Sequence, residues 1–159
     1  MTQKGSNLIT KGVISRNRKA RFNYAISEKI EAGLVLTGSE VKSLRYGRAN
    51  IEEAYAAKEN GELYLVNCHI AEYSSASYFS HEPTRKRKIL LRRKQLNNFI
   101  GAVSKKGATI VPLTLYFNDR GIAKVELGLG VGKKLYDKRE TAKTRDWSRQ
   151  KARILRNNN

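Results

Sequence analysis

The sequence is poor in residues that form covalent or metal cross-links. It has a single cysteine, Cys68, among 159 residues, which excludes an internal disulfide and a multi-cysteine metal cluster. Histidine is equally scarce, with two residues, and no cluster of His, Asp and Glu has the spacing of metal ligands. We therefore expect no metal, no cofactor and a reduced, partly buried thiol at Cys68.

Long apolar runs and acidic residues are also in short supply. No run of about 18 uncharged apolar residues occurs, and Lys4 and Lys11 stand where a signal peptide would have its apolar segment. We expect a cytoplasmic protein without membrane contact. The length fits one domain. Only 14 acidic residues accompany 32 basic ones, and the resulting net charge of +18 indicates a polyanionic partner.

The positive charge is concentrated in three segments. Residues 1–21 hold six basic and no acidic side chains, residues 85–94 hold seven and none, and residues 133–159 hold ten against three. The remaining residues, nine basic and eleven acidic, are slightly negative. Lysine and arginine neutralise phosphates, and exposed aromatic rings can stack on unpaired bases. We infer an RNA-binding protein, because no helix-turn-helix, zinc-finger or basic-zipper pattern supports DNA binding.

Hydrophobic periodicity predicts a mainly β fold. Strands are predicted over 24–36, on both sides of Asn60-Gly61 within 54–66, and over 88–91, 109–117 and 122–129. Helical spacing predicts helices over 37–47 and 92–106. The first strand should bend or bulge at Gly33, and Pro112 should lie at an edge or bulge. The fold class we expect is a small antiparallel oligonucleotide-binding-type barrel of about six strands with two or three short helices.

The carboxyl-terminal segment differs from the barrel in composition. From Lys133 onward, apolar residues are too few to bury against a core, so we expect a basic tail that is disordered when free. Its good helix formers could fold once a polyanion neutralises the arginines. The expected organisation is a flexible amino terminus over 1–8, an RNA-binding barrel over 9–132 and a tail over 133–159.

Two local patterns suggest catalysis or nucleotide binding, and each has a structural alternative. Cys68 and His69 could be a nucleophile and its base, but neighbours in a strand point to opposite faces, so a core thiol and a surface imidazole are favoured. Residues 128–134 resemble a phosphate loop, yet Leu127 stands where that motif needs glycine and lysine ends the segment where it needs a hydroxyl. Glycines there would instead permit a bend or a close backbone approach. We therefore expect that this protein is not an enzyme.

A series of short motifs runs along most of the chain. They are Asn17-Arg-Lys-Ala20, Glu31-Ala-Gly33, Leu36-Thr-Gly-Ser-Glu-Val-Lys-Ser-Leu-Arg45, Pro83-Thr-Arg85 with Lys88 and Leu90-Leu91, and Gly132-Lys-Lys134 with Asp137-Lys-Arg139. In this order they closely resemble the small protein B family, the SsrA-binding proteins of bacteria. The resemblance spans about residues 8 to 156.

The resemblance implies a function in trans-translation. An oligonucleotide-binding-type barrel would hold the tRNA-like domain of transfer-messenger RNA (SsrA) and deliver it to ribosomes stalled on messages without a stop codon. The tail, helical on the ribosome, would occupy the empty decoding centre and mRNA channel of the small subunit. A monomer suffices for this role. The alternative is a ribosomal or initiation-type RNA-binding structural protein.

The resemblance also implies site residues. It places transfer-messenger RNA binding at Glu31 and Leu90, and the basic residues of the chain extend the candidate set to Arg18, Lys19, Arg45, Arg85, Lys88, Arg92, Lys124, Lys133 and Lys134. The ribosome-engaging candidates are Tyr136, Asp137, Lys138, Arg139, Trp147 and Ile154. Tyr136 stands where many members have a histidine that stacks on a ribosomal RNA base, and Arg92 where some have asparagine. Without the resemblance, an ion pair with a nearby lysine is an alternative role for Glu31.

Overall fold

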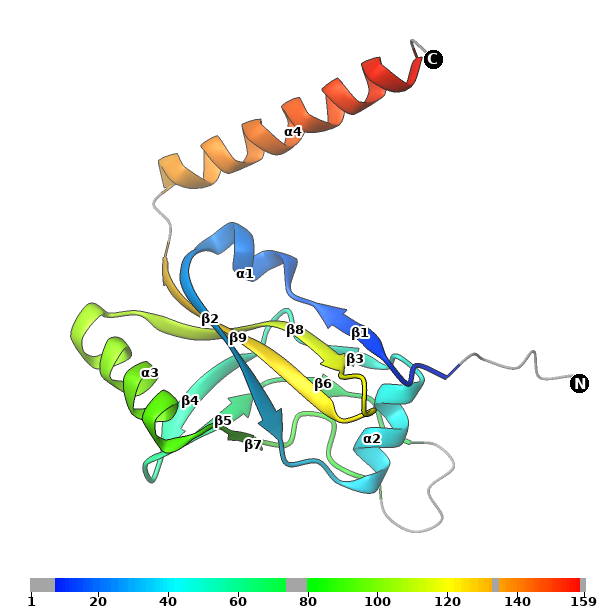
Figure 1. Cartoon of the computed structure of the whole chain (residues 1–159), viewed down its shortest axis with the longest axis vertical. Helices are drawn as coiled ribbons and strands as arrows, with labels where there is room; N and C mark the ends of the chain where they lie inside the picture. Colours follow the sequence, from blue (N-terminus) through cyan, green and yellow to red (C-terminus); the bar gives the residue numbers. More distant parts are fainter. Residues whose placement is uncertain (1–7, 74–79, 133–134, 158–159) are drawn as a thin grey trace, which may run out of the picture.

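A curled seven-stranded sheet forms the centre of the molecule (Figure 1). The computed structural model describes residues 8–73, 80–132 and 135–157. Its strands are β1 (Gly12–Arg16), β2 (Tyr24–Leu34), β3 (Ala49–Asn50), β4 (Tyr55–Glu59), β5 (Glu62–Val66), β6 (His69–Ile70), β7 (Arg87–Leu90), β8 (Thr109–Phe117) and β9 (Ala123–Gly132). Its helices are α1 (Arg18–Asn23), α2 (Gly38–Arg45), α3 (Arg93–Lys106) and α4 (Leu135–Asn157).

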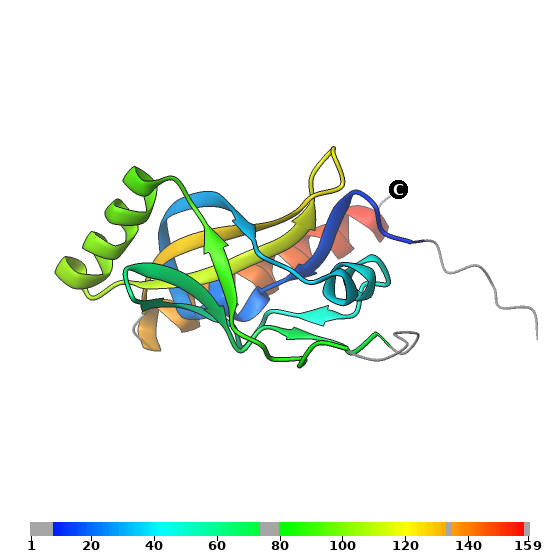
Figure 2. The same ribbon diagram turned by 90° about the horizontal axis from the view of Figure 1, so that it is seen from below.

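The main sheet is antiparallel, with the strand order β1-β8-β9-β2-β7-β5-β4. The edge strand β4 contacts β8, so the sheet curls back on itself (Figure 2). This confirms the predicted mainly β, antiparallel class. The prediction of about six strands is close to the seven of this sheet, and a separate pair brings the strands in the described residues to nine. Strands β3 and β6, which pair with each other, have two residues each, too few for a period-two pattern to reveal them.

Local sequence patterns predicted the positions of several turns and helix ends correctly, but they placed one bulge at the wrong residue. Asn60 and Gly61 have φ values of 51° and 77°, the positive φ that a tight hairpin turn between β4 and β5 requires. Helix α3 ends at Gly107 in the left-handed conformation. The bulge expected at Gly33 instead lies between Ile26 and Glu28, where the register of β2 against β9 shifts. The register of β8 also shifts just after Pro112, so the predicted proline bulge is confirmed.

Two apolar clusters occupy the two sides of the sheet. The larger lies inside the curl, between the sheet and helices α2 and α3, and includes Leu44, Phe99 and Leu127. The smaller lies under α1 and consists of Ala20, Val111 and Leu113. A Cβ atom at Gly128 would come within 2.8 Å of the Leu113 side chain. The glycine-rich end of β9 therefore allows close packing, the structural role that the sequence favoured.

Helix α4 spans Leu135–Asn157. We expected a tail that is disordered when free and helical on the ribosome, and this helix is compatible with the second state; disorder of the free tail stays a prediction. Its good helix formers favour a helix, and its apolar side chains remain outside: Trp147 and Ile154 are 65% and 58% exposed. The Arg145 guanidinium lies 5.8 Å from the Phe22 ring centroid, which places α4 beside α1. Segment 1–8 lies outside the described residues except for Leu8.

Among the helices that the structure describes, none combines the length and the apolar character that a membrane span requires.

Candidate RNA-binding surface

Four predicted RNA-binding residues share one face of the sheet. Side chains alternate along a strand, and the core takes Ala32, Ile89 and Val125. Their sequence neighbours therefore point outward. These are Glu31, Lys88, Leu90 and Lys124, and together with Tyr116 of β8 they form what we call the outer sheet face. The register brings three strands together here, because Gly33 of β2 pairs with Leu90 of β7 and with Lys124 of β9. Leu90 is 49% exposed and adds an apolar side chain to this face.

Glu31 is held by a tyrosine. The Tyr116 hydroxyl donates a hydrogen bond to Oε2 of Glu31. Burial raises the pKa of Tyr116, and the nearby Glu31 carboxylate raises it further, so the hydroxyl stays protonated as a donor. In the part of the chain that the structure describes, Glu31 makes no ion pair with a lysine, and its Oε1 atom has no hydrogen-bond partner. A carboxylate fixed in this way can accept hydrogen bonds from a base or a ribose hydroxyl.

The basic segment 85–94 is less available than its composition indicated. Arg87 is fully buried and bonds to the carboxylate of Glu40 and to the carbonyl of Cys68, the latter at 2.6 Å. Arg85 lies 2.5 Å from the same carboxylate. Lys86 and Arg93 pair with Glu59 and Glu62 at 3.2 and 3.3 Å. The basic segment 85–94 therefore has less free charge than its composition indicates, and the predicted contact Arg85 also holds α2 against the loop before β7; its RNA binding stays a prediction.

Glu40 is the buried centre of this ion cluster. Thr37 and Glu40 form a capping box that begins α2, and the backbone N–H of Thr37 donates to Glu40 at 2.9 Å. Burial alone would raise the pKa of Glu40, but the hydrogen bonds from Arg85, Thr37 and Arg87 outweigh it and hold the pKa below its usual value. Sequence reasoning missed this cluster. The Thr-x-x-Glu spacing marks the cap, but no local signal marks Arg87 as buried.

The remaining predicted RNA contacts lie at other places on the barrel. Arg18 and Lys19 are on α1, where Lys19 pairs with Glu53 at 2.5 Å. Arg45 is exposed in the last turn of α2, and Arg92 immediately precedes α3. Lys133 and Lys134 lie outside the described residues.

The predicted ribosome contacts follow helix α4. Arg139, Trp147 and Ile154 are exposed on it. The backbone of Tyr136, Asp137 and Lys138 lies in its first turn.

The suspected nucleophile is inert in this structure. Cys68 is fully buried, and burial raises the pKa of its thiol to about 11. His69 is exposed on β6, so the core thiol and surface imidazole are confirmed. Within the described ranges, no group of three or more His, Cys, Asp or Glu side chains could hold a metal ion.

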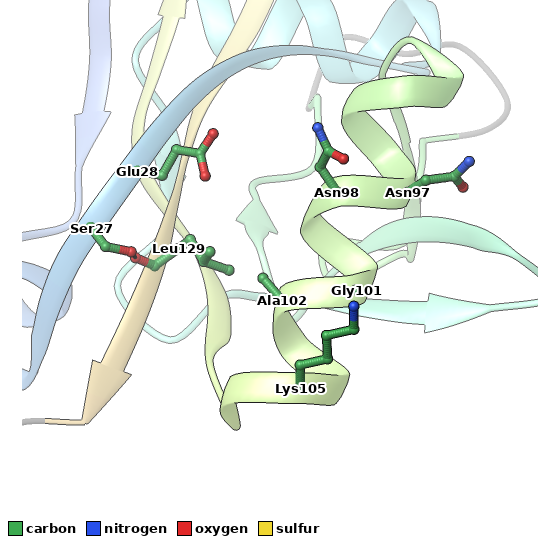
Figure 3. Close-up of a pocket in the computed structure, with 8 residues that line it drawn as sticks. All are labelled: Ser27, Glu28, Asn97, Asn98, Gly101, Ala102, Lys105 and Leu129. Atoms are coloured by element: carbon green, nitrogen blue, oxygen red, sulfur yellow. Dashed lines mark hydrogen bonds between the residues drawn. The ribbon is translucent and has the colours of Figure 1, made fainter.

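A groove of about 590 Å³ separates β2 from α3 (Figure 3). Its walls are Ser27 and Glu28 of β2, Leu129 of β9, and Asn97, Asn98, Gly101, Ala102 and Lys105 of α3. The carboxylate of Glu28 and the ammonium of Lys105 offset each other, and no predicted RNA contact lines the groove. Its charge therefore does not favour phosphate, in contrast to the outer sheet face.

Comparisons with known proteins agree with the motifs. The family model described as SmpB protein matches residues 14–157. The SsrA-binding protein of Sinorhizobium fredii is 57% identical over 156 residues, 98% of each chain, and that of Agrobacterium fabrum is 54% identical over 158 residues, 99% of each. A chain from the solved structure "tmRNA-SmpB: a journey to the center of the bacterial ribosome" is 49% identical, with a TM-score of 0.64, over 80% of this chain and 92% of that one. This chain belongs to the SmpB protein family.

Proposed function

We propose that this protein binds the tRNA-like domain of transfer-messenger RNA and delivers it to ribosomes stalled on mRNA without a stop codon. Relatives at 54–58% identity are named SsrA-binding proteins, and the matching solved chain comes from a structure of transfer-messenger RNA with SmpB on the ribosome. Delivery permits peptide tagging and rescue of the ribosome. The place of action is then the cytoplasm, where ribosomes work.

The outer sheet face is the observation that carries this proposal. It combines a fixed carboxylate at Glu31, an exposed apolar side chain at Leu90 and ammonium groups at Lys88 and Lys124. The cations can position RNA through its phosphates, whereas the carboxylate can distinguish hydrogen-bond donors on bases and riboses. Such a face binds RNA without converting it, and one copy of the chain provides all of it.

A second surface would engage the ribosome. Helix α4 follows β9 and lies beside α1 (Figure 1). Its side chains Trp147 and Ile154 are exposed. Its arginines and lysines suit an RNA-lined channel. We assign the decoding centre and mRNA channel to the segment 133–159, and transfer-messenger RNA to the barrel.

Substitution of Glu31 separates recognition from overall charge. Glu31→Gln removes one negative charge, which by electrostatics alone should strengthen RNA binding. We expect it instead to weaken affinity for the tRNA-like domain about tenfold, because hydrogen bonds to a charged acceptor are lost. The measurement is a gel-shift titration at one fixed salt concentration.

Glu28→Gln is the matched control for that titration. Glu28 lies on the same strand and is exposed, but it faces the groove beside α3. Its substitution should leave affinity unchanged or slightly higher. Equal affinity of the wild-type protein for the tRNA-like domain and for an arbitrary hairpin would overturn the proposed function.

A further inference from the structure

A hollow of about 390 Å³ lies next to the outer sheet face, between β1, α1 and the middle of β8 and β9. Three arginines line it, Arg16 at the end of β1 and Arg18 and Arg21 on α1, and we call it the arginine hollow. Val13, Asn17, Thr114 and Glu126 complete its lining. Figure 1 shows α1 following β1 directly.

Buried Asn17 fixes the backbone between Arg16 and Arg18. Its Oδ1 accepts from the N–H of Ala20 at 3.0 Å, and its Nδ2 donates to the carbonyls of Pro112 and Ile51 at 2.9 and 3.2 Å. Its own N–H donates to the carbonyl of Leu113 at 2.9 Å. The arginines on either side therefore start from a rigid backbone, which lowers the entropy lost when their guanidinium groups bind a ligand.

The charge in the hollow is largely uncompensated. Its one carboxylate, Glu126, lies 3.8 Å from Arg21. Arg16 and Arg18 form no ion pair with any residue that the structure describes. Lys19 follows Arg18 in the sequence but points away from the hollow. It lines a separate depression, where its Nζ lies 2.5 Å from Oε1 of Glu53. Helix α1 thus directs its arginines to one side and its lysine to the other.

The geometry points to a phosphate-binding subsite in the arginine hollow, occupied by a backbone phosphate of the tRNA-like domain. Guanidinium groups bind phosphate oxygens through two parallel hydrogen bonds, and three of them surround this one hollow. The hollow is continuous with the outer sheet face, because Glu126 pairs with Glu31 across β9 and β2, and Thr114 lies two residues before Tyr116 on β8. This inference rests on the proposed function, since the same RNA must cover both surfaces.

Arg18→Ala tests the subsite against Lys105→Ala, which removes the same charge from the groove beside α3. Affinity for the tRNA-like domain is measured over a series of salt concentrations. We expect Arg18→Ala to weaken binding on the order of tenfold and to reduce the slope of log affinity against log salt by about one. Lys105→Ala should stay within about twofold of the wild-type protein, because Lys105 lines the groove beside α3, which contains no predicted RNA contact.

Arg18→Lys separates guanidinium geometry from charge. It should keep the wild-type salt slope, since the charge remains, but lose affinity severalfold, since the paired hydrogen bonds are lost. Thermal melting confirms that each variant folds.

Equal losses for Arg18→Ala and Lys105→Ala would show an effect of net charge and overturn the subsite. Wild-type affinity in Arg18→Ala would overturn it too. In both cases the wild-type preference for the tRNA-like domain over a hairpin would leave the proposed function standing. Absence of that preference would overturn the function itself, and with it the subsite.

Discussion

Glu40→Gln is expected to lower the free energy of unfolding by about 3–5 kcal/mol at neutral pH. Glu40 and Arg87 are both fully buried, and Arg85 shares the same carboxylate. Removing the negative charge leaves Arg87 buried without a charged partner, and desolvation of that cation is no longer offset. Denaturant unfolding of the two proteins at pH 7 measures the difference.

The same substitution should be sensitive to pH. The pKa of Glu40 in the folded protein is below its usual value of 4.5, so the carboxylate stabilises the fold above that pH. The stabilisation is lost as the pH falls through the lower folded pKa, and the difference between the wild type and Glu40→Gln should shrink there. A difference that stayed constant with pH would contradict the ionised pair. The exposed Glu59, 3.2 Å from Lys86, is the control, and Glu59→Gln should cost less than about 1 kcal/mol.

Deletion of residues 133–159 is expected to abolish peptide tagging on stalled ribosomes while affinity for the tRNA-like domain stays within about threefold of wild type. As far as the structure describes the chain, neither apolar cluster includes a side chain of α4. The barrel should therefore fold without the tail. Tagging in a reconstituted translation system and gel shift of the tRNA-like domain measure the two activities separately.

Point variants control for the size of that deletion. Trp147 and Ile154 are mostly exposed, so Trp147→Ala and Ile154→Ala should not destabilise the barrel. They should reduce tagging without changing affinity for the tRNA-like domain. Normal tagging by the truncated protein would show that the barrel performs both steps.

Elements whose determinants are close in sequence were predictable. The Asn60-Gly61 turn and helix α3 with its terminal Gly107 depend on neighbours within one or two turns of chain. The outer sheet face was partly predictable, because alternation along β2 separates Glu31 from buried Ala32.

Contacts between distant segments were not predictable. Glu31 and its donor Tyr116 are 85 residues apart, and Glu40 and Arg87 are 47 apart. The composition of 85–94 gives the number of basic residues, but it does not reveal that Arg87 is buried. The sequence alone does not show which acidic residue pairs with Arg87. The helix at 135–157 depends on local propensity, so the good helix formers of the tail could indicate it.

A photo-crosslinking residue at position 90 tests the central claim most directly. Leu90 is 49% exposed on the outer sheet face, whereas Val103, 38% exposed on α3, lines a different depression with Ala56 and Lys58. The two variants are irradiated with the tRNA-like domain in an excess of nonspecific RNA. We expect crosslinks to the tRNA-like domain from position 90 and few from position 103. Equal crosslinking from the two positions, or more from position 103, would contradict the outer sheet face as the RNA-binding surface.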